Sequence, residues 1–415
     1  MYKGSALWLW TALTLANPLS AQERYVPTQT RETQAYTPQP YRSGAISVLP
    51  SISTQMVYSD NIFAIDERKE SDILWIAEPS LIAGYHHDTY EVSLTLDAEI
   101  AAFNEFSREN YADYGAALSG ALRLSDTLSL PVRAAYARRH FRRISEEDQG
   151  GLGPTEFDRL SAGSGVIYRG PYVQGQLLVD ARQYHFDDAL TPQGVLIDNS
   201  AQDRDEFSLY GRVGLAGRAV MRPYLYGQYD TTDFNDAAGT TLIRDSDVVA
   251  YGIGSEIALT NVLSGDIYAG LATRSMDARQ LNDVDITSYG ASLTWEPVDR
   301  LRVELGVDRG FDNTVQLNTG TSIRTEWTLE VDYEFYKQWL LEASALHNKS
   351  RLLGSDTSEE VERYGLGMGA SYKVSDALWV GVEYRHLTQD VEAGLISTIA
   401  EFSQNIVSAR TSFYF

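Results

Sequence analysis

The six histidines are the side chains best suited to acid–base or metal chemistry near neutral pH. His140 has the most charged surroundings, because an acidic segment with Glu146 and Glu147 follows it. Hydrolysis would also need a nucleophile, and the sequence contains no nucleophile elbow and no Ser–His pair with a suitable spacing. His86 and His87 are adjacent in a predicted short turn, which is more typical of solvated side chains than of a metal pair. The full set is His86, His87, His140, His185, His347 and His386.

The composition excludes several classes of protein. The 415 residues include 34 Lys and Arg against 57 Asp and Glu, a formal net charge of -23, so nucleic acid is not an expected partner. The chain has no cysteine, which excludes disulfides, thiolate catalysis and Cys-ligated zinc. A mean hydropathy of -0.27 excludes a bundle of membrane-spanning helices.

Apolar and polar residues alternate with a period of two over most of the chain. In the segment 323–335, Ile323 and Trp327 belong to an apolar odd-numbered series, and Glu326 belongs to a polar even-numbered series. A helix would scatter both series around its circumference, whereas a strand separates them completely. The segment 90–100 follows the same pattern, and no segment of comparable length has a 3.6-residue period. The elements that position any functional side chain are therefore strands.

The connections between these strands alternate between short turns, such as 86–89, and longer polar segments, such as 187–205. We count eight short turns and nine long segments, which predicts an all-β fold of about 18 antiparallel strands. Short turns at one end and long loops at the other are typical of a transmembrane β-barrel, and an even strand number puts both chain ends in the periplasm. Aromatic residues near both strand ends, such as Tyr85 and Tyr251, fit the girdles of such a barrel.

The two ends of the chain predict where the protein is located in the cell. Residues 1–21 have a positive start, an apolar stretch and a small-residue cleavage point, as in a secretory signal peptide. Residues 22–44 are polar and proline-containing, which predicts a flexible periplasmic segment before a barrel of residues 45–415. The last strand alternates toward Phe413 and Phe415, the ending that the barrel-assembly machinery of a Gram-negative outer membrane would recognise.

The motif Tyr58-Ser59-Asp60-Asn61-Ile62-Phe63 resembles the end of the first strand in a family of outer-membrane β-barrel porins, exopolysaccharide-associated β-barrel porin type 2. Pro79, Asp203-Arg204-Asp205, Arg244-Asp245-Ser246 and the closing aromatic strand are also similar, and the resemblance spans about residues 44–415. It implies an outer-membrane passage for secreted polysaccharide or small polar solutes, beside a periplasmic polysaccharide-export protein. It implies no catalytic residue and no cofactor.

Strand parity places many charged side chains on the inner face of the predicted barrel. About 18 strands enclose an aqueous channel unless something fills it, and unpaired charge is tolerated only where it is wet. The arginines placed inward are Arg133, Arg139, Arg182, Arg212, Arg222, Arg302, Arg324 and Arg385. The acids placed inward include Glu78, Glu91, Asp97, Glu99, Asp180, Glu256, Asp266, Glu304, Asp308, Glu326, Glu330, Asp332, Glu334, Glu342 and Glu383.

Several alternatives stay open at this point. The inward charges could pair and fill the lumen, which would make the protein a structural or adhesive surface barrel. A hydrolase at the barrel rim, using His140 or His185, is a further alternative. Tyr224, Tyr226 and Tyr268 point inward and could either stack on sugar rings or pack on the wall. Inward glycines such as Gly254 could leave room in the channel or permit strong coiling of the strands.

The membrane itself is the other expected partner. The barrel wall would contact outer-membrane lipid, and the long loops would lie beside lipopolysaccharide. These loops are acidic, as in Ser355–Glu360, so divalent cations could bridge them to the anionic lipid, with plain solvated loops as the default.

Overall fold

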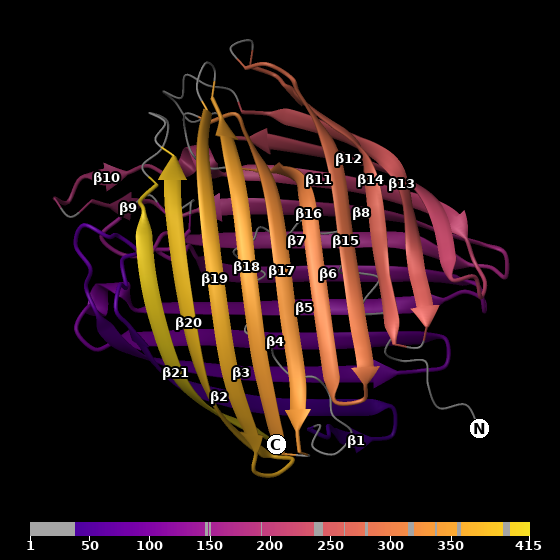
Figure 1. Cartoon of the computed structure of the whole chain (residues 1–415), viewed down its shortest axis with the longest axis horizontal. Coiled ribbons are helices and arrows are strands. Elements are labelled where there is room, and N and C mark those ends of the chain that lie inside the picture. Colours follow the sequence, from indigo (N-terminus) through magenta and orange to yellow (C-terminus); the bar gives the residue numbers. More distant parts are fainter. Residues whose placement is uncertain are drawn as a thin grey trace.

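The computed structural model describes residues 38–415 apart from 146–147, 149–150, 192, 236–243, 261, 279–280, 314–318, 337, 355–357 and 393–398. The predicted signal peptide and most of the segment 22–44 lie outside the described residues. Eighteen long strands form one closed antiparallel barrel, as the sequence predicts (Figure 1). They are β2 (Ile46–Ser59), β3 (Asp72–His86), β4 (Tyr90–Phe103), β5 (Tyr111–Arg123), β6 (Leu128–His140), β7 (Glu156–Arg169), β8 (Val173–Phe186), β11 (Arg204–Leu215), β12 (Met221–Phe234), β13 (Ser246–Thr260), β14 (Leu263–Met276), β15 (Val284–Val298), β16 (Leu301–Asp312), β17 (Thr321–Phe335), β18 (Trp339–Leu353), β19 (Ser358–Lys373), β20 (Leu378–Glu392) and β21 (Phe402–Tyr414).

The barrel closes where the first long strand meets the last. β2 pairs with β21 in a continuous register from Ser51 opposite Tyr414 to Ser59 opposite Ile406. This closure leaves no long unpaired strand edge, which is the condition for a sheet in lipid. In Figure 1 the strands of the front wall cross those of the back wall steeply, as the tilted strands of a barrel do.

The remaining elements are short. β1 (Tyr41–Ser43) pairs with β2, so the end of the segment predicted as flexible joins the sheet. The 3₁₀ turns η1 (Ser107–Glu109) and η2 (Ser200–Gln202) and the hairpin β9 (Ala189–Leu190) and β10 (Leu196–Ile197) lie in the long connections, and the hairpin projects beyond the barrel wall in Figure 1. No helix in the described part of the chain is long and apolar enough to cross a membrane.

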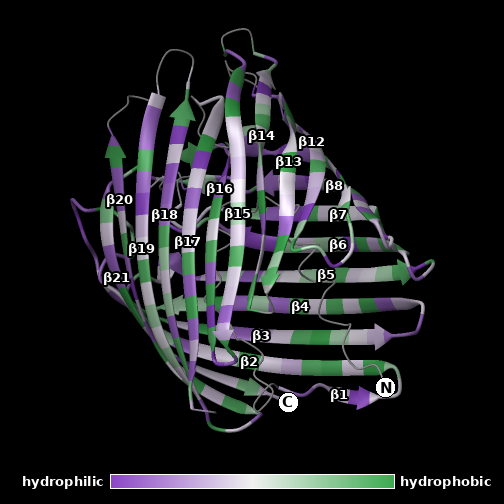
Figure 2. Ribbon diagram, turned by 45° about the vertical axis from the view of Figure 1, so that its right-hand side comes forward, coloured by the Kyte–Doolittle hydropathy of each residue, from purple (hydrophilic) through white to green (hydrophobic). Residues whose placement is uncertain are grey.

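The distribution of exposed residues is the reverse of that in a soluble protein. Leu366 and Met368 on β19 are 55% and 66% exposed, whereas Glu326 on β17 is 4% exposed. Figure 2 shows the alternation of hydrophobic and hydrophilic residues along individual strands. This pattern places an apolar outer surface against lipid and the polar series inside.

Candidate functional site: the barrel lumen

The closed sheet encloses a cavity of about 1640 Å³ that is lined by strands from every part of the barrel. Twelve of the residues that we predicted to line the pore do line this cavity. They are Arg133, Arg182, Arg212, Arg324, Arg385, Asp97, Glu99, Asp180, Glu304, Glu326, Glu330 and Glu383. The lining is therefore polar and charged, unlike the apolar outer surface.

The other five predicted pore-lining residues do not line this cavity. They lie at strand ends beside the short turns. Arg222 pairs there with Glu256 at 3.0 Å, and Arg302 forms an ion pair with Glu304. The five residues are Arg222, Arg302, Glu91, Asp332 and Glu334.

The lumen arginines contact carboxylates. Arg133 Nε donates to Asp180 Oδ1 at 2.7 Å, and Arg212 lies 2.8 Å from Glu256. Ion pairs that stay partly in contact with water contribute little net stability, so they fix side-chain positions more than they stabilise the fold. The pairing foreseen as an alternative is thus present, and a cavity coexists with it. Further ion pairs of predicted lumen residues include Arg139–Asp97, Arg182–Glu206, Arg212–Asp266, Arg324–Asp312, Arg324–Glu326 and Arg385–Glu383.

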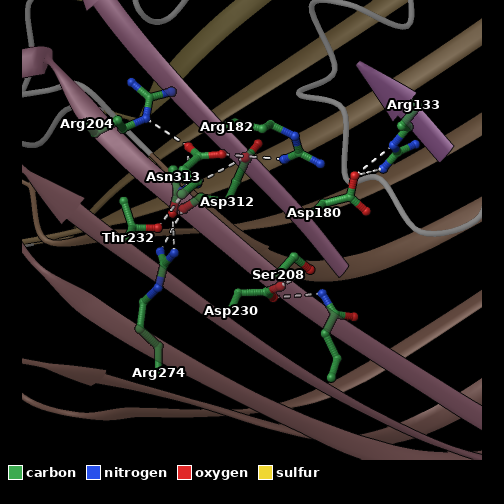
Figure 3. A network of polar contacts seen from close by, with 12 residues as sticks. Arg133, Asp180, Arg182, Arg204, Ser208, Asp230, Thr232, Arg274, Asp312 and Asn313 are labelled. Atoms are coloured by element: carbon green, nitrogen blue, oxygen red, sulfur yellow. Dashed lines mark hydrogen bonds and ion pairs between the residues drawn. The ribbon is translucent and has the colours of Figure 1, made fainter. Parts of the chain in front are cut away.

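Arg204 and Glu206 are lumen residues that the sequence analysis missed. We placed Asp203–Asp205 in a long loop and began the strand at Phe207, but β11 begins at Arg204, and extending the parity by three residues would have found both side chains. The Glu206 carboxylate lies 2.8 Å from Arg204 Nε and 3.4 Å from Arg182 Nη1, so one acid serves two guanidinium groups (Figure 3). Arg204 also lies over the Tyr184 ring at 4.2 Å, a cation–π contact that holds its side chain against the wall.

A second missed group ties the start of the β16–β17 loop to the wall (Figure 3). The buried Arg274 donates to the Asp312 carbonyl at 2.8 Å and to Thr321 Oγ1 at 2.6 Å, and it also contacts Asn313. Asn313 Nδ2 in turn donates to Glu206 Oε1 at 3.0 Å. Because β16 and β11 are not neighbours, Asn313 bends inward to reach that acid.

The loop after β6 also enters the lumen. Arg143 pairs with Glu109 at 2.8 Å and with Asp148 at 3.0 Å. Burial lowers the pKa of Arg143, but the two carboxylates outweigh burial and raise the pKa above its ordinary value, so this group stays charged. Ile144 packs against a cluster of Ala64, Leu387 and Phe402, far from β6 along the barrel circumference.

The inward tyrosines pack on glycines of neighbouring strands. A Cβ added at Gly254 would lie 2.3 Å from Tyr224 Cζ, and one added at Gly290 would lie 2.4 Å from Tyr268 Cε1. The expectation that such glycines leave room in the channel is wrong for Gly254, because a tyrosine ring occupies the space. Tyr224 is buried on the wall, and its hydroxyl donates to Asp266 Oδ1 at 2.5 Å.

The histidines singled out as acid–base candidates each have a carboxylate partner. His140 Nδ1 lies 2.9 Å from Asp113 Oδ1, and His185 Nδ1 lies 2.7 Å from Asp203 Oδ2. Among the residues that the structure describes, neither ring has a hydrogen bond to a serine or threonine hydroxyl. Those residues also contain no group of three or more His, Asp or Glu placed to hold a metal ion.

The motif that carried the family resemblance lies at the closing seam. Asp60 Oδ1 accepts from the Asn405 backbone N–H at 2.7 Å, and its Oδ2 accepts from Asn405 Nδ2 at 2.6 Å. Asn61 is completely buried and donates through Nδ2 to the Ser403 carbonyl at 3.1 Å. The motif therefore fastens the end of β2 to the start of β21.

A closed barrel with an apolar outer surface and a polar cavity wide enough for water defines the class of outer-membrane porin-like proteins. Residues 34–413 match the family described as "Putative beta-barrel porin 2", and the chain belongs to that family. This match confirms the resemblance seen in the sequence motifs.

No curated protein matches the chain. Among solved structures, it is similar to the siderophore receptor PirA from Acinetobacter baumannii, with a TM-score of 0.49, 8% identity, 89% of this chain covered and 80% of that chain covered. It is also similar to OpdK from Pseudomonas aeruginosa with vanillate, with a TM-score of 0.44, 14% identity and coverages of 89% and 99%.

Proposed function

We propose that the barrel gives a secreted polysaccharide, or other polar solutes, a passage across the outer membrane. The observation that supports this proposal is the polar cavity of about 1640 Å³ inside a closed barrel with an apolar exterior. Hydroxyl-rich chains exchange hydrogen bonds with such a lining, and the arginine–carboxylate pairs offer both donors and acceptors. The N-terminus would then face the periplasm, beside a polysaccharide-export protein.

Single-channel recording in planar bilayers tests the passage. Purified, folded protein should give stepwise ion currents, and a complete absence of current from folded protein would contradict an open pore. Deletion of the gene tests the cargo: surface polysaccharide should fall while outer-membrane protein levels stay normal. Unchanged secretion would contradict the export role and leave small solutes as the cargo.

A structural or adhesive barrel is the second candidate, and the inward loops favour it. Arg143 and Asn313 both bring long-loop backbone into the lumen, and a sufficiently dense set of such contacts would close it. The two candidates differ in conductance, which is absent from a plugged barrel.

We further infer that the protein is not an enzyme. The His140–Asp113 and His185–Asp203 pairs have the geometry of an orienting carboxylate, but in the part of the chain that the structure describes no serine or threonine hydroxyl hydrogen-bonds to either ring. Replacing both histidines by alanine should leave polymer secretion unchanged. A hydrolase activity that disappears in this double variant would contradict the inference.

A further inference from the structure

Positive charge is concentrated on one part of the lumen wall. Among the described residues that line the cavity, the stretch from β6 through β11 carries eight arginines and only two carboxylates, Asp180 and Glu206. The arginines are two on β6, two directly after it, one each on β7 and β8, and two on β11. Among the same described lining residues, the stretch from β2 through β5 contributes five carboxylates and no arginine or lysine. The chain as a whole has a charge of -23, so a net positive wall inside it is a local exception.

The strand register arranges four of these arginines in a descending series. Arg204 is opposite Tyr184, and Arg182 is opposite Glu206, one inward row further from the long loops. Arg133 belongs to the next row, because it is opposite Gly163, which is opposite Asp180. Arg212 follows two rows later. Inward rows are about 7 Å apart, since a strand rises about 3.3 Å per residue.

Two of the carboxylates beside these arginines are shared. Glu206 contacts both Arg182 and Arg204, and Glu256 contacts both Arg212 and Arg222. A guanidinium carries five N–H donors in a fixed fork, so it can hold one carboxylate and accept another. Where an acid is shared, a passing anion can therefore replace the carboxylate of the protein at one of the two arginines. Figure 3 shows Arg204, Arg182 and Arg133 along this part of the wall.

We propose that Arg204, Arg182, Arg133 and Arg212, here called the arginine wall, bind the carboxylate groups of an acidic polysaccharide as it passes. The inference rests on the proposed function and names its substrate class. A carboxylate matches the guanidinium fork in a bidentate geometry, whereas a neutral sugar offers only hydroxyl groups. Arginines on successive levels of the wall let one carboxylate be held while the next is released.

The test is block of the ion current by oligosaccharides of equal length. Oligogalacturonate, which carries a carboxylate on each sugar, should interrupt the wild-type current at a concentration at least tenfold lower than neutral malto-oligosaccharide. The double variant Arg182→Gln/Arg204→Gln should raise the half-blocking concentration of oligogalacturonate about tenfold. It should leave block by the neutral oligomer unchanged.

Arg410→Gln is the matched control. Arg410 on β21 faces the same cavity across the barrel and pairs with Glu78 at 2.7 Å, so the variant removes one positive charge from a different wall. Oligogalacturonate should block this variant at the same concentration as the wild type. If the double variant does not fold, Arg212→Lys keeps the charge but removes the fork, and it should still weaken the block.

The outcomes separate this inference from the proposed function. Current that is blocked equally by acidic and neutral oligomers overturns the arginine wall and leaves the passage intact. An equal effect of Arg410→Gln and of the double variant also overturns it, because the position of the charge would then not matter. Absence of current from folded wild-type protein overturns both.

Discussion

Arg363 on β19 donates a hydrogen bond of 2.7 Å from Nη2 to the carbonyl oxygen of Ile144, a residue 219 positions earlier in the chain. Six strands, β20, β21, β2, β3, β4 and β5, separate β19 from β6 along the shorter way around the barrel. The bond therefore spans the lumen, and the loop after β6 crosses the channel to make it. We therefore expect this contact to limit how far the lumen is open.

Replacing Arg363 by alanine should loosen this loop. A hydrogen bond from a charged donor contributes about 1.5–3 kcal/mol, so the displaced loop should become about tenfold more populated or more. Single-channel recording should then show a larger or noisier conductance. Arg351→Ala, an exposed position on the neighbouring β18, is the control and should behave like wild type.

A disulfide tests the same loop in the opposite direction. The chain has no cysteine, so Ile144→Cys with Leu387→Cys would form the sole candidate pair. Oxidation should hold the loop in place and suppress the conductance increase caused by Arg363→Ala, and reduction should restore it. An oxidised pair that leaves that increase intact would show that this loop does not limit the current.

The closing seam should depend on the motif at the end of β2. Asp60→Ala removes two hydrogen bonds from Asn405 and leaves its backbone N–H and its Nδ2 without these acceptors, and one such unsatisfied donor costs about 1–3 kcal/mol. In detergent gels, the temperature above which the protein no longer migrates as the compact folded barrel should fall. Asp88→Ala, in an exposed short turn, should leave that temperature unchanged. An equal fall in both variants would argue against a special role for the seam.

The fit of Tyr268 against Gly290 should make the two positions interdependent. A Cβ at Gly290 would lie 2.4 Å from the Tyr268 ring, whose hydroxyl donates to Asp308 Oδ2 at 2.5 Å. Gly290→Ala should therefore destabilise the barrel by about 1–3 kcal/mol, as overpacking does. In the double variant with Tyr268→Ser the two effects should not add, which urea unfolding can measure. Gly310→Ala has no atom within 4 Å of the new Cβ and is the control.

The terminal aromatic residue should matter for assembly more than for stability. Phe415 is exposed, and its backbone N–H donates to the Pro50 carbonyl at 3.0 Å, a bond that does not need the ring. Phe415→Ala should lower the amount of protein inserted into the outer membrane severalfold, whereas protein refolded in detergent should melt like wild type. Phe335→Ala, another exposed aromatic residue at a short-turn strand end, should insert normally.

The sequence by itself determined the barrel. The period-two alternation identified the strands, the regular exchange of short and long connections predicted 18 of them, and both were confirmed. Even β7, whose segment 160–168 has weak alternation, was recovered, because its turn and its long loop on either side were clear. These features are local, so a single strand and its two ends are enough to reveal them.

The tertiary structure alone decided which inward side chains meet. Parity states that Arg182 and Glu206 both face the lumen, but only the register of β8 against β11 makes them partners. The same holds for Tyr268 on Gly290, and for Arg363 with Ile144, whose contact also depends on the path of a long loop. Alternation is fixed by neighbours in the chain, whereas register, barrel closure and loop path are fixed by contacts between distant segments, and no local pattern encodes them.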